Sequence, residues 1–116
     1  MAISSYLSLI AFFVFAQAIT LTEAQQNIDV FRWVVPYDGP QEFTANVGDT
    51  MIFRWAQGVH NVYIHPTMDC NLDGRIVVGS TPGTEYTFVE ADGSPEGTDM
   101  FFSCDIGNGA HCRAGK

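Results

Sequence analysis

Residues 42–55 have the sequence EFTANVGDTMIFRW. Apolar, β-branched and aromatic residues fill both halves of this stretch, and Gly48-Asp49 stands between them as a tight turn. The stretch therefore predicts two short strands, 42–47 and 50–55, joined by that turn.

The same pattern continues along most of the chain. Turns rich in Gly, Pro and Asp separate five further strand-like stretches, which cover residues 28–35, 60–64, 75–78, 84–89 and 99–104. Residues 65–74 and 90–98 are expected to form surface loops, and no stretch predicts a substantial helix. Seven short strands at close spacing favour an all-β domain, either a sandwich or a barrel. The pattern does not predict the order of the strands.

The N-terminal region has a different character. Residues 6–18 are uncharged and mostly apolar. They are too few for a membrane-spanning helix, which needs roughly 20 residues, but they match the core of a signal peptide. Small residues at cleavage-like spacing follow, at 16–18 and 22–24, and we prefer the second site. We predict a signal peptide over residues 1–24 and a secreted domain over residues 25–116, with no membrane span after cleavage. An amphiphilic membrane anchor is the alternative.

The net negative charge of the chain limits the kinds of binding partner that we expect. The chain has 13 Asp and Glu against 5 Lys and Arg, for a net charge of −8. Because the basic residues form no cluster, we expect neither nucleic acid nor an anionic membrane surface as a partner. An acidic surface would favour a positively charged redox partner, if the protein has one. The expected mature region suffices for one domain, which we expect to be a monomer.

The cysteines are Cys70, Cys104 and Cys112. In an oxidising compartment two can pair and one is left over, and the three pairings are equally open. A metal is one reason for an unpaired cysteine. His111 follows Cys104 across residues 105–110, whose two glycines allow a tight loop, and His60 opens an earlier predicted strand.

A thiolate and two imidazoles form a trigonal set that suits copper in both of its oxidation states. We therefore predict one copper ion at His60, Cys104 and His111, in a β scaffold stiff enough to favour electron transfer. If Cys104 is the ligand, Cys70 and Cys112 are left to pair. Zinc could occupy the same three ligands with a water.

The order of these residues resembles that of the phytocyanins, the blue-copper cupredoxin family that includes stellacyanins, uclacyanins and plantacyanins. The resemblance extends over nearly the whole of residues 25–116. The segments that carry it are Val47-Gly48-Asp49-Thr50, Phe53-Arg54-Trp55, His60-Asn61-Val62, Cys70, Gly83 with Tyr86-Thr87-Phe88, Phe101-Phe102-Ser103-Cys104 and His111-Cys112-Arg113-Ala114-Gly115.

The resemblance implies a Greek-key β-sandwich of the cupredoxin type that transfers single electrons through a type 1 copper cycling between Cu(I) and Cu(II). It implies His60, Cys104 and His111 as copper ligands and a Cys70–Cys112 disulfide. Asn61 falls where the family has an asparagine that steadies the cysteine sulfur by hydrogen bonding.

Two features depart from the family. The loop from Cys104 to His111 is slightly longer, and the position of the weak axial ligand, Met or Gln in the family, corresponds to Lys116. The family's final strand follows that position, so we expect the domain to lack its last strand. Two explanations stay open: the sequence is part of a longer chain, or the site has three protein ligands with an axial water or backbone oxygen. Met68 is a further candidate for the axial position.

Other residues have simpler interpretations. His65 precedes Pro66 and is expected to be a solvated loop residue, whereas Trp33 and Trp55 are expected in the core. The sequence has no catalytic triad, phosphate-binding glycine loop or HExxH motif, so we predict that the protein is not an enzyme. Two alternative functions stay open: a metal-free extracellular interaction module, and copper or zinc binding without redox turnover.

Overall fold

The computed structural model describes residues 2–6, 25–93, 95 and 97–115 of the chain. Short strands dominate these ranges, with one 3₁₀ helix, η2, and one short α-helix, α1. Their bounds in chain order are β1 (Ala2–Tyr6), β2 (Asn27–Val30), β3 (Glu42–Asn46), β4 (Thr50–Phe53), β5 (Val62–His65), β6 (Ile76–Gly79), β7 (Thr84–Thr87), η2 (Glu90–Gly93), β8 (Thr98–Ser103) and α1 (Ala110–Arg113).

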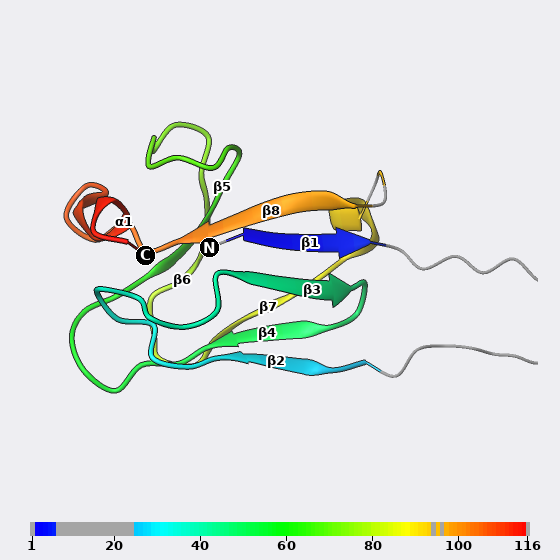
Figure 1. The fold of residues 1–116 in the computed structure, drawn as a ribbon, viewed down its shortest axis with the longest axis horizontal. Coiled ribbons are helices and arrows are strands. Elements are labelled where there is room, and N and C mark those ends of the chain that lie inside the picture. The colour runs from blue at the N-terminus through cyan, green and yellow to red at the C-terminus, as the bar shows by residue number, and fades with distance from the viewer. Residues whose placement is uncertain (1, 7–24, 94, 96, 116) are drawn as a thin grey trace, which may run out of the picture.

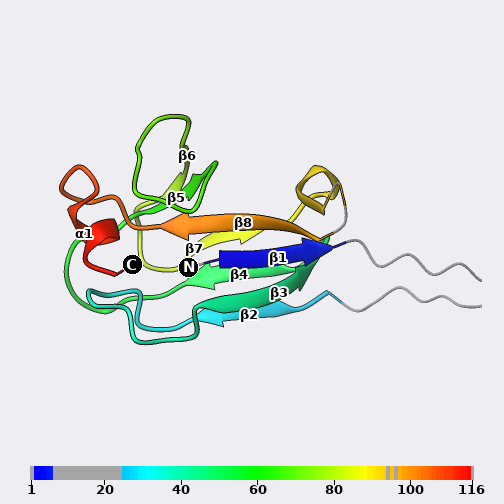
Figure 2. The ribbon, with the colours of Figure 1, turned by 45° about the horizontal axis from the view of Figure 1, so that its top comes forward.

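The strands form two sheets. One has five strands in the order β3-β1-β8-β5-β6, and the other has three in the order β2-β4-β7. In Figure 1 and Figure 2, α1 and the segment between β4 and β5 lie at the same end of the molecule. The architecture confirms the predicted all-β class, and its two sheets are compatible with a β-sandwich.

All seven predicted strands are present, with shifted ends. The largest difference is in the first, which was predicted over 28–35 but ends at Val30. Arg32 has a φ of 59°, outside the extended region, and this interrupts the strand. The following residues stay attached to the three-stranded sheet, because the Trp33 N–H donates to the Arg54 carbonyl at 2.9 Å.

The predicted turn at Gly48-Asp49 is confirmed. Gly48 has a φ of +96°, a left-handed conformation that glycine adopts without strain. The buried carboxylate of Asp49 accepts hydrogen bonds from the backbone N–H groups of Asn46 and Gln26, each at 2.9 Å. One side chain therefore fixes the turn and ties it to the start of β2.

Both sheets contribute to a single aromatic core. Trp33, Phe53, Phe88 and Phe102 are almost completely buried, and Trp33 contacts Phe53 edge-on with ring centroids 5.0 Å apart. Trp55 is also buried, so the expectation that both tryptophans are core residues is confirmed. The remaining buried hydrophobic residues of this cluster are Val30, Tyr37, Ala45, Met51, Val62, Met100 and Cys104.

The first residues of the expected signal peptide lie inside the larger sheet. Strand β1 pairs in parallel with β3, from Ala2 opposite Glu42 to Tyr6 opposite Asn46. It also pairs antiparallel with β8 over residues 2–5. The rest of the expected leader and both cleavage sites lie outside the described residues. Cleavage after residue 24 would remove β1 and leave β3 and β8 facing each other without a strand between them.

Among the described helices, none is long and apolar enough to cross a membrane. The longest α-helical segment in these ranges is the four-residue α1. The sequence pattern gave no sign of this helix, because a single turn is too short to show apolar periodicity.

The position of β1 predicts an effect of N-terminal truncation on stability. A chain that begins at Gln25 should unfold at a lower denaturant concentration than the chain that begins at Met1, since each lost backbone hydrogen bond contributes about 1 kcal/mol. Hydrogen exchange should quicken on the edges of β3 and β8 that face β1. As an internal control, amides in β2 and β7 should respond only to the global change. Equal stability of the two chains would show that β1 does not hold the sheet together.

Candidate metal centre

Three segments converge on one cluster of metal-binding side chains. His60 lies between β4 and β5, Cys104 directly follows β8, and His111 lies in α1. One donor atom from each residue falls within 4.8 Å of the other two. The structure therefore brings together the three residues that the sequence predicted as ligands.

The distances within the cluster can be compared with those around a single ion. The Cys104 Sγ lies 3.4 Å from Nδ1 of His111 and 3.8 Å from Nδ1 of His60. Metal–sulfur bonds of about 2.3 Å and metal–nitrogen bonds of about 2.0–2.1 Å, typical of zinc, place sulfur and nitrogen roughly 3.5–3.8 Å apart at tetrahedral to trigonal angles. Because both imidazoles turn Nδ1 toward the sulfur at such distances, one ion fits between the three atoms.

Burial differs among the three residues. Cys104 is 0% exposed and His60 is 6% exposed, whereas His111 is intermediate. The cysteine is buried because side chains alternate along β8, so Phe102 and Cys104 both point into the core. The cluster is therefore closed on the core side and nearest to solvent at His111.

The ring of His60 is confined on two sides. Trp55 contacts it edge-on, with ring centroids 5.8 Å apart. On its Nε2 side lies Gly58, where a Cβ atom would come within 3.0 Å of Nε2. A side chain at position 58 would thus require the imidazole or the backbone to shift by a few tenths of an ångström.

Asn61 connects the His60 segment to the cysteine. Its backbone N–H donates to Sγ of Cys104 at 3.4 Å, and its side-chain Oδ1 accepts the backbone N–H of Asp105 at 2.6 Å. The indole N–H of Trp33 donates to the Asn61 carbonyl at 2.9 Å, which holds this residue against the core. Asn61 thus lies beside the sulfur, with a main-chain donor directed at it.

The loop between Cys104 and His111 turns sharply, as its glycines predicted. Gly107, Asn108 and Gly109 all have left-handed conformations, with φ of 72°, 54° and 90°. The N–H of Gly109 donates to the Asp105 carbonyl at 3.0 Å, and that of His111 to the Ile106 carbonyl at 3.2 Å. These bonds close the loop and direct His111 back toward the sulfur.

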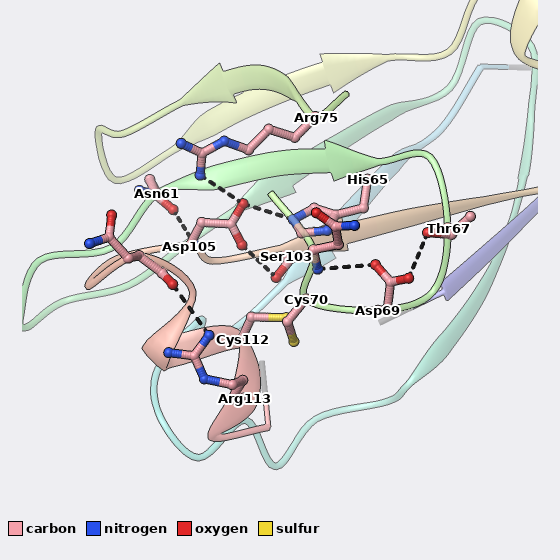
Figure 3. Close-up of a disulfide and its surroundings, with 12 residues drawn as sticks. Asn61, His65, Thr67, Asp69, Cys70, Arg75, Ser103, Asp105, Cys112 and Arg113 are labelled. Atoms are coloured by element: carbon pink, nitrogen blue, oxygen red, sulfur yellow. Dashed lines mark hydrogen bonds and ion pairs between the residues drawn. A yellow bond between two sulfur atoms is a disulfide. The ribbon is translucent and has the colours of Figure 1, made fainter. Parts of the chain in front are cut away.

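The Cys70–Cys112 disulfide is present, in agreement with the pairing that the resemblance implied. It fastens α1, which carries His111, to the segment that follows β5 (Figure 3). The neighbouring Asp69 carboxylate accepts the Asn71 N–H and the Thr67 hydroxyl, and these hydrogen bonds lower the pKa of Asp69. The ordered turn around Cys70 and the disulfide therefore anchor one ligand of the cluster.

The interpretation of His65 as a solvated loop residue was wrong. Strand β5 extends to residue 65, and His65 is 2% exposed. Its Nε2 lies 2.7 Å from Oδ2 of Asp105, the residue after the cysteine ligand. Arg75 and Ser103 also donate to this carboxylate, at 3.1 Å each. Extending the predicted strand by one residue would have placed His65 in β5, but no sequence signal pointed to Asp105 or Arg75.

The two candidates for the axial position are Lys116 and Met68. Lys116, the predicted axial position, lies outside the described residues. Met68 is 75% exposed and lines a hollow of about 400 Å³ beside the disulfide, together with His65 and Asp69.

No family model, curated protein or solved structure matches this chain.

A matched pair of glycine variants tests the confinement of His60. Gly58 and Gly83 both have left-handed conformations, but a Cβ atom at Gly83 would meet nothing within 4 Å. Both Gly58→Ala and Gly83→Ala should lower the free energy of unfolding, by about 1–2 kcal/mol through backbone strain. Only Gly58→Ala should also weaken Cu(II) binding, by roughly tenfold or more, when the metal-free protein is titrated with Cu(II). Equal affinities in the two variants would show that Gly58 does not position His60.

The disulfide should contribute strongly to stability. It closes a loop with a sequence separation of 42, for which the chain-entropy estimate is about 4 kcal/mol. Cys70→Ser, Cys112→Ser and the double variant should each lose about this amount in urea unfolding, because each removes the same bridge once. A double variant that loses twice as much as either single variant would contradict this account.

Proposed function

We propose that this protein is a secreted type 1 copper protein that carries single electrons. The observation that carries the proposal is the cluster of one thiol and two imidazole nitrogens, at separations that suit a single ion. Soft sulfur favours Cu(I) and imidazole also suits Cu(II), so this donor set serves both oxidation states.

When bound, copper would supply the one-electron change between Cu(I) and Cu(II). The chain's contribution is to hold its three ligands in nearly the same place in both states. The closed loop before His111, the disulfide beside it and the hydrogen bonds of Asn61 all restrict ligand movement. A site that rearranges little presents a low barrier to electron transfer.

The different exposure of the three ligand residues supports electron transfer through the protein surface near His111. Because His60 and Cys104 are buried and His111 is intermediate, the shortest approach for a partner is at the α1 end of the molecule. The net charge of −8 over the whole chain favours a positively charged redox partner. We propose that the carrier acts as a monomer, without enzymatic activity of its own and without nucleic acid.

Secretion is supported by two features. The apolar N-terminal stretch has the properties of a signal peptide, and disulfides such as Cys70–Cys112 persist in oxidising compartments. The resemblance to phytocyanins supports the same location. On this proposal, the two sheets belong to a Greek-key sandwich of the cupredoxin type.

Substitution of the cysteine ligand tests the proposal directly. The full chain loaded with Cu(II) should show an intense thiolate-to-copper absorption band in the visible region and a reversible one-electron reduction. Cys104→Ser should abolish the band, because the thiolate that donates the charge is gone.

The Cys70→Ser/Cys112→Ser double variant serves as the control. It removes two sulfur atoms and keeps Cys104, so the band should persist in whatever fraction of the protein is folded. A folded wild-type protein that binds Cu(II) without this band, or binds only zinc, would favour redox-inactive metal binding. A folded protein that binds neither metal would favour the interaction module.

A further inference from the structure

A buried charged cluster lies directly behind the cysteine ligand. The Asp105 side chain has no exposed surface, and its Oδ2 accepts from Nε2 of His65 at 2.7 Å and from a guanidinium nitrogen of Arg75 at 3.1 Å. Its Oδ1 accepts the Ser103 hydroxyl at 3.1 Å. Figure 3 shows Arg75 and His65 approaching the carboxylate from opposite sides.

A buried carboxylate is costly unless its oxygens are paired and hydrogen-bonded. Here three donors from three segments meet it: His65 from β5, Ser103 from the end of β8, and Arg75 from the segment before β6. Arg75 is itself fixed, since its guanidinium lies 4.1 Å from the ring centroid of Tyr63. Among the described residues, Nδ1 of His65 has no hydrogen-bond partner, so Nε2 is the ring nitrogen through which His65 holds Asp105.

The same residue is tied to the ligand by its main chain. Asp105 follows Cys104, and its backbone N–H donates to Oδ1 of Asn61, whose own N–H donates to the cysteine sulfur. The side chain of Asp105 thus fixes the backbone immediately after the ligand, while its backbone orients the residue that contacts the sulfur.

We propose that Asp105, held by His65 and Arg75, is a positioning residue for Cys104, and that its buried negative charge lowers the reduction potential of the bound metal. The second part rests on the proposed copper function. The first part does not, because it concerns the chain itself.

The positioning role is tested first in the metal-free full chain, by hydrogen exchange at the amides of Asn61 and Asp105. Both amides donate to side-chain acceptors in this arrangement, so their protection reports on the position of Cys104 and Asn61. His65→Leu and Asp105→Ala should speed their exchange by about tenfold or more, as expected for losing a hydrogen bond to a charged group. His65→Gln, which keeps a donor for Asp105, should restore much of the protection.

The charge is tested separately in the copper-loaded protein. Asp105→Asn keeps an oxygen for His65 and Arg75 and offers an amide N–H to Ser103, so it removes the charge with little change of shape. It should raise the midpoint potential, by on the order of tenfold in the reduction equilibrium or about 59 mV for one electron. Arg75→Met should lower the potential, because it leaves the negative charge of Asp105 less compensated.

The exposed pair Arg32–Asp38 provides matched controls. Asp38→Asn and Arg32→Met remove the same charges at the surface and should change neither the two exchange rates nor the potential. If Asp105 had a purely structural role, Asp105→Asn and Arg75→Met would lower the stability of the protein, but they would not shift the midpoint potential in opposite directions.

The two parts can fail separately. Unchanged exchange in folded His65→Leu would overturn the positioning role, even if Asp105→Ala fails to fold. An unchanged potential in Asp105→Asn would overturn the role of the charge. A wild-type protein that shows no redox-active copper would refute the proposed function and the charge effect with it, while the exchange result would still decide the positioning role.

Discussion

A thiol with no exposed surface lies at the end of β8, where three distant parts of the chain meet. The alternation of β8 turns Cys104 into the core beside the segment that carries His60, and the tight loop after it returns His111 to the same point. The disulfide, the Asn61 hydrogen bonds and the Asp105 cluster all act on residues next to this sulfur. The three ligand residues lie just outside the strands, and these contacts hold the segments that carry them in place.

Much of this could be predicted from the sequence, because the signals are local. Alternating apolar residues predict the strands, and glycines predict the turns at Gly48 and after Cys104. The unusual order of histidines and cysteines indicated the cluster, since an odd cysteine beside a histidine needs an explanation. The sheet order could not be predicted, because it depends on pairings between residues far apart in sequence.

The buried polar cluster shows where such reasoning fails. His65 beside Pro66 has the local pattern of a surface turn. Asp105 and Arg75 are charged residues, which usually lie at the protein surface. Burial becomes favourable only when these residues come together in the fold, because His65 and Arg75 provide hydrogen-bond donors for the Asp105 carboxylate. The pairing of β1 with β3 and β8 is a similar case: the strand appears where composition suggested only a leader. Signal cleavage would thus remove residues 2–6, whereas the five-stranded sheet includes them as β1.

X-ray absorption at the copper edge of the loaded full chain tests the central claim most directly, since it reports the atoms bound to the metal. The account predicts one sulfur and two imidazole nitrogens as the close neighbours of the ion, from Cys104, His60 and His111. A shell of nitrogen and oxygen atoms without sulfur would contradict it, because the buried thiol would then have no part in binding the metal.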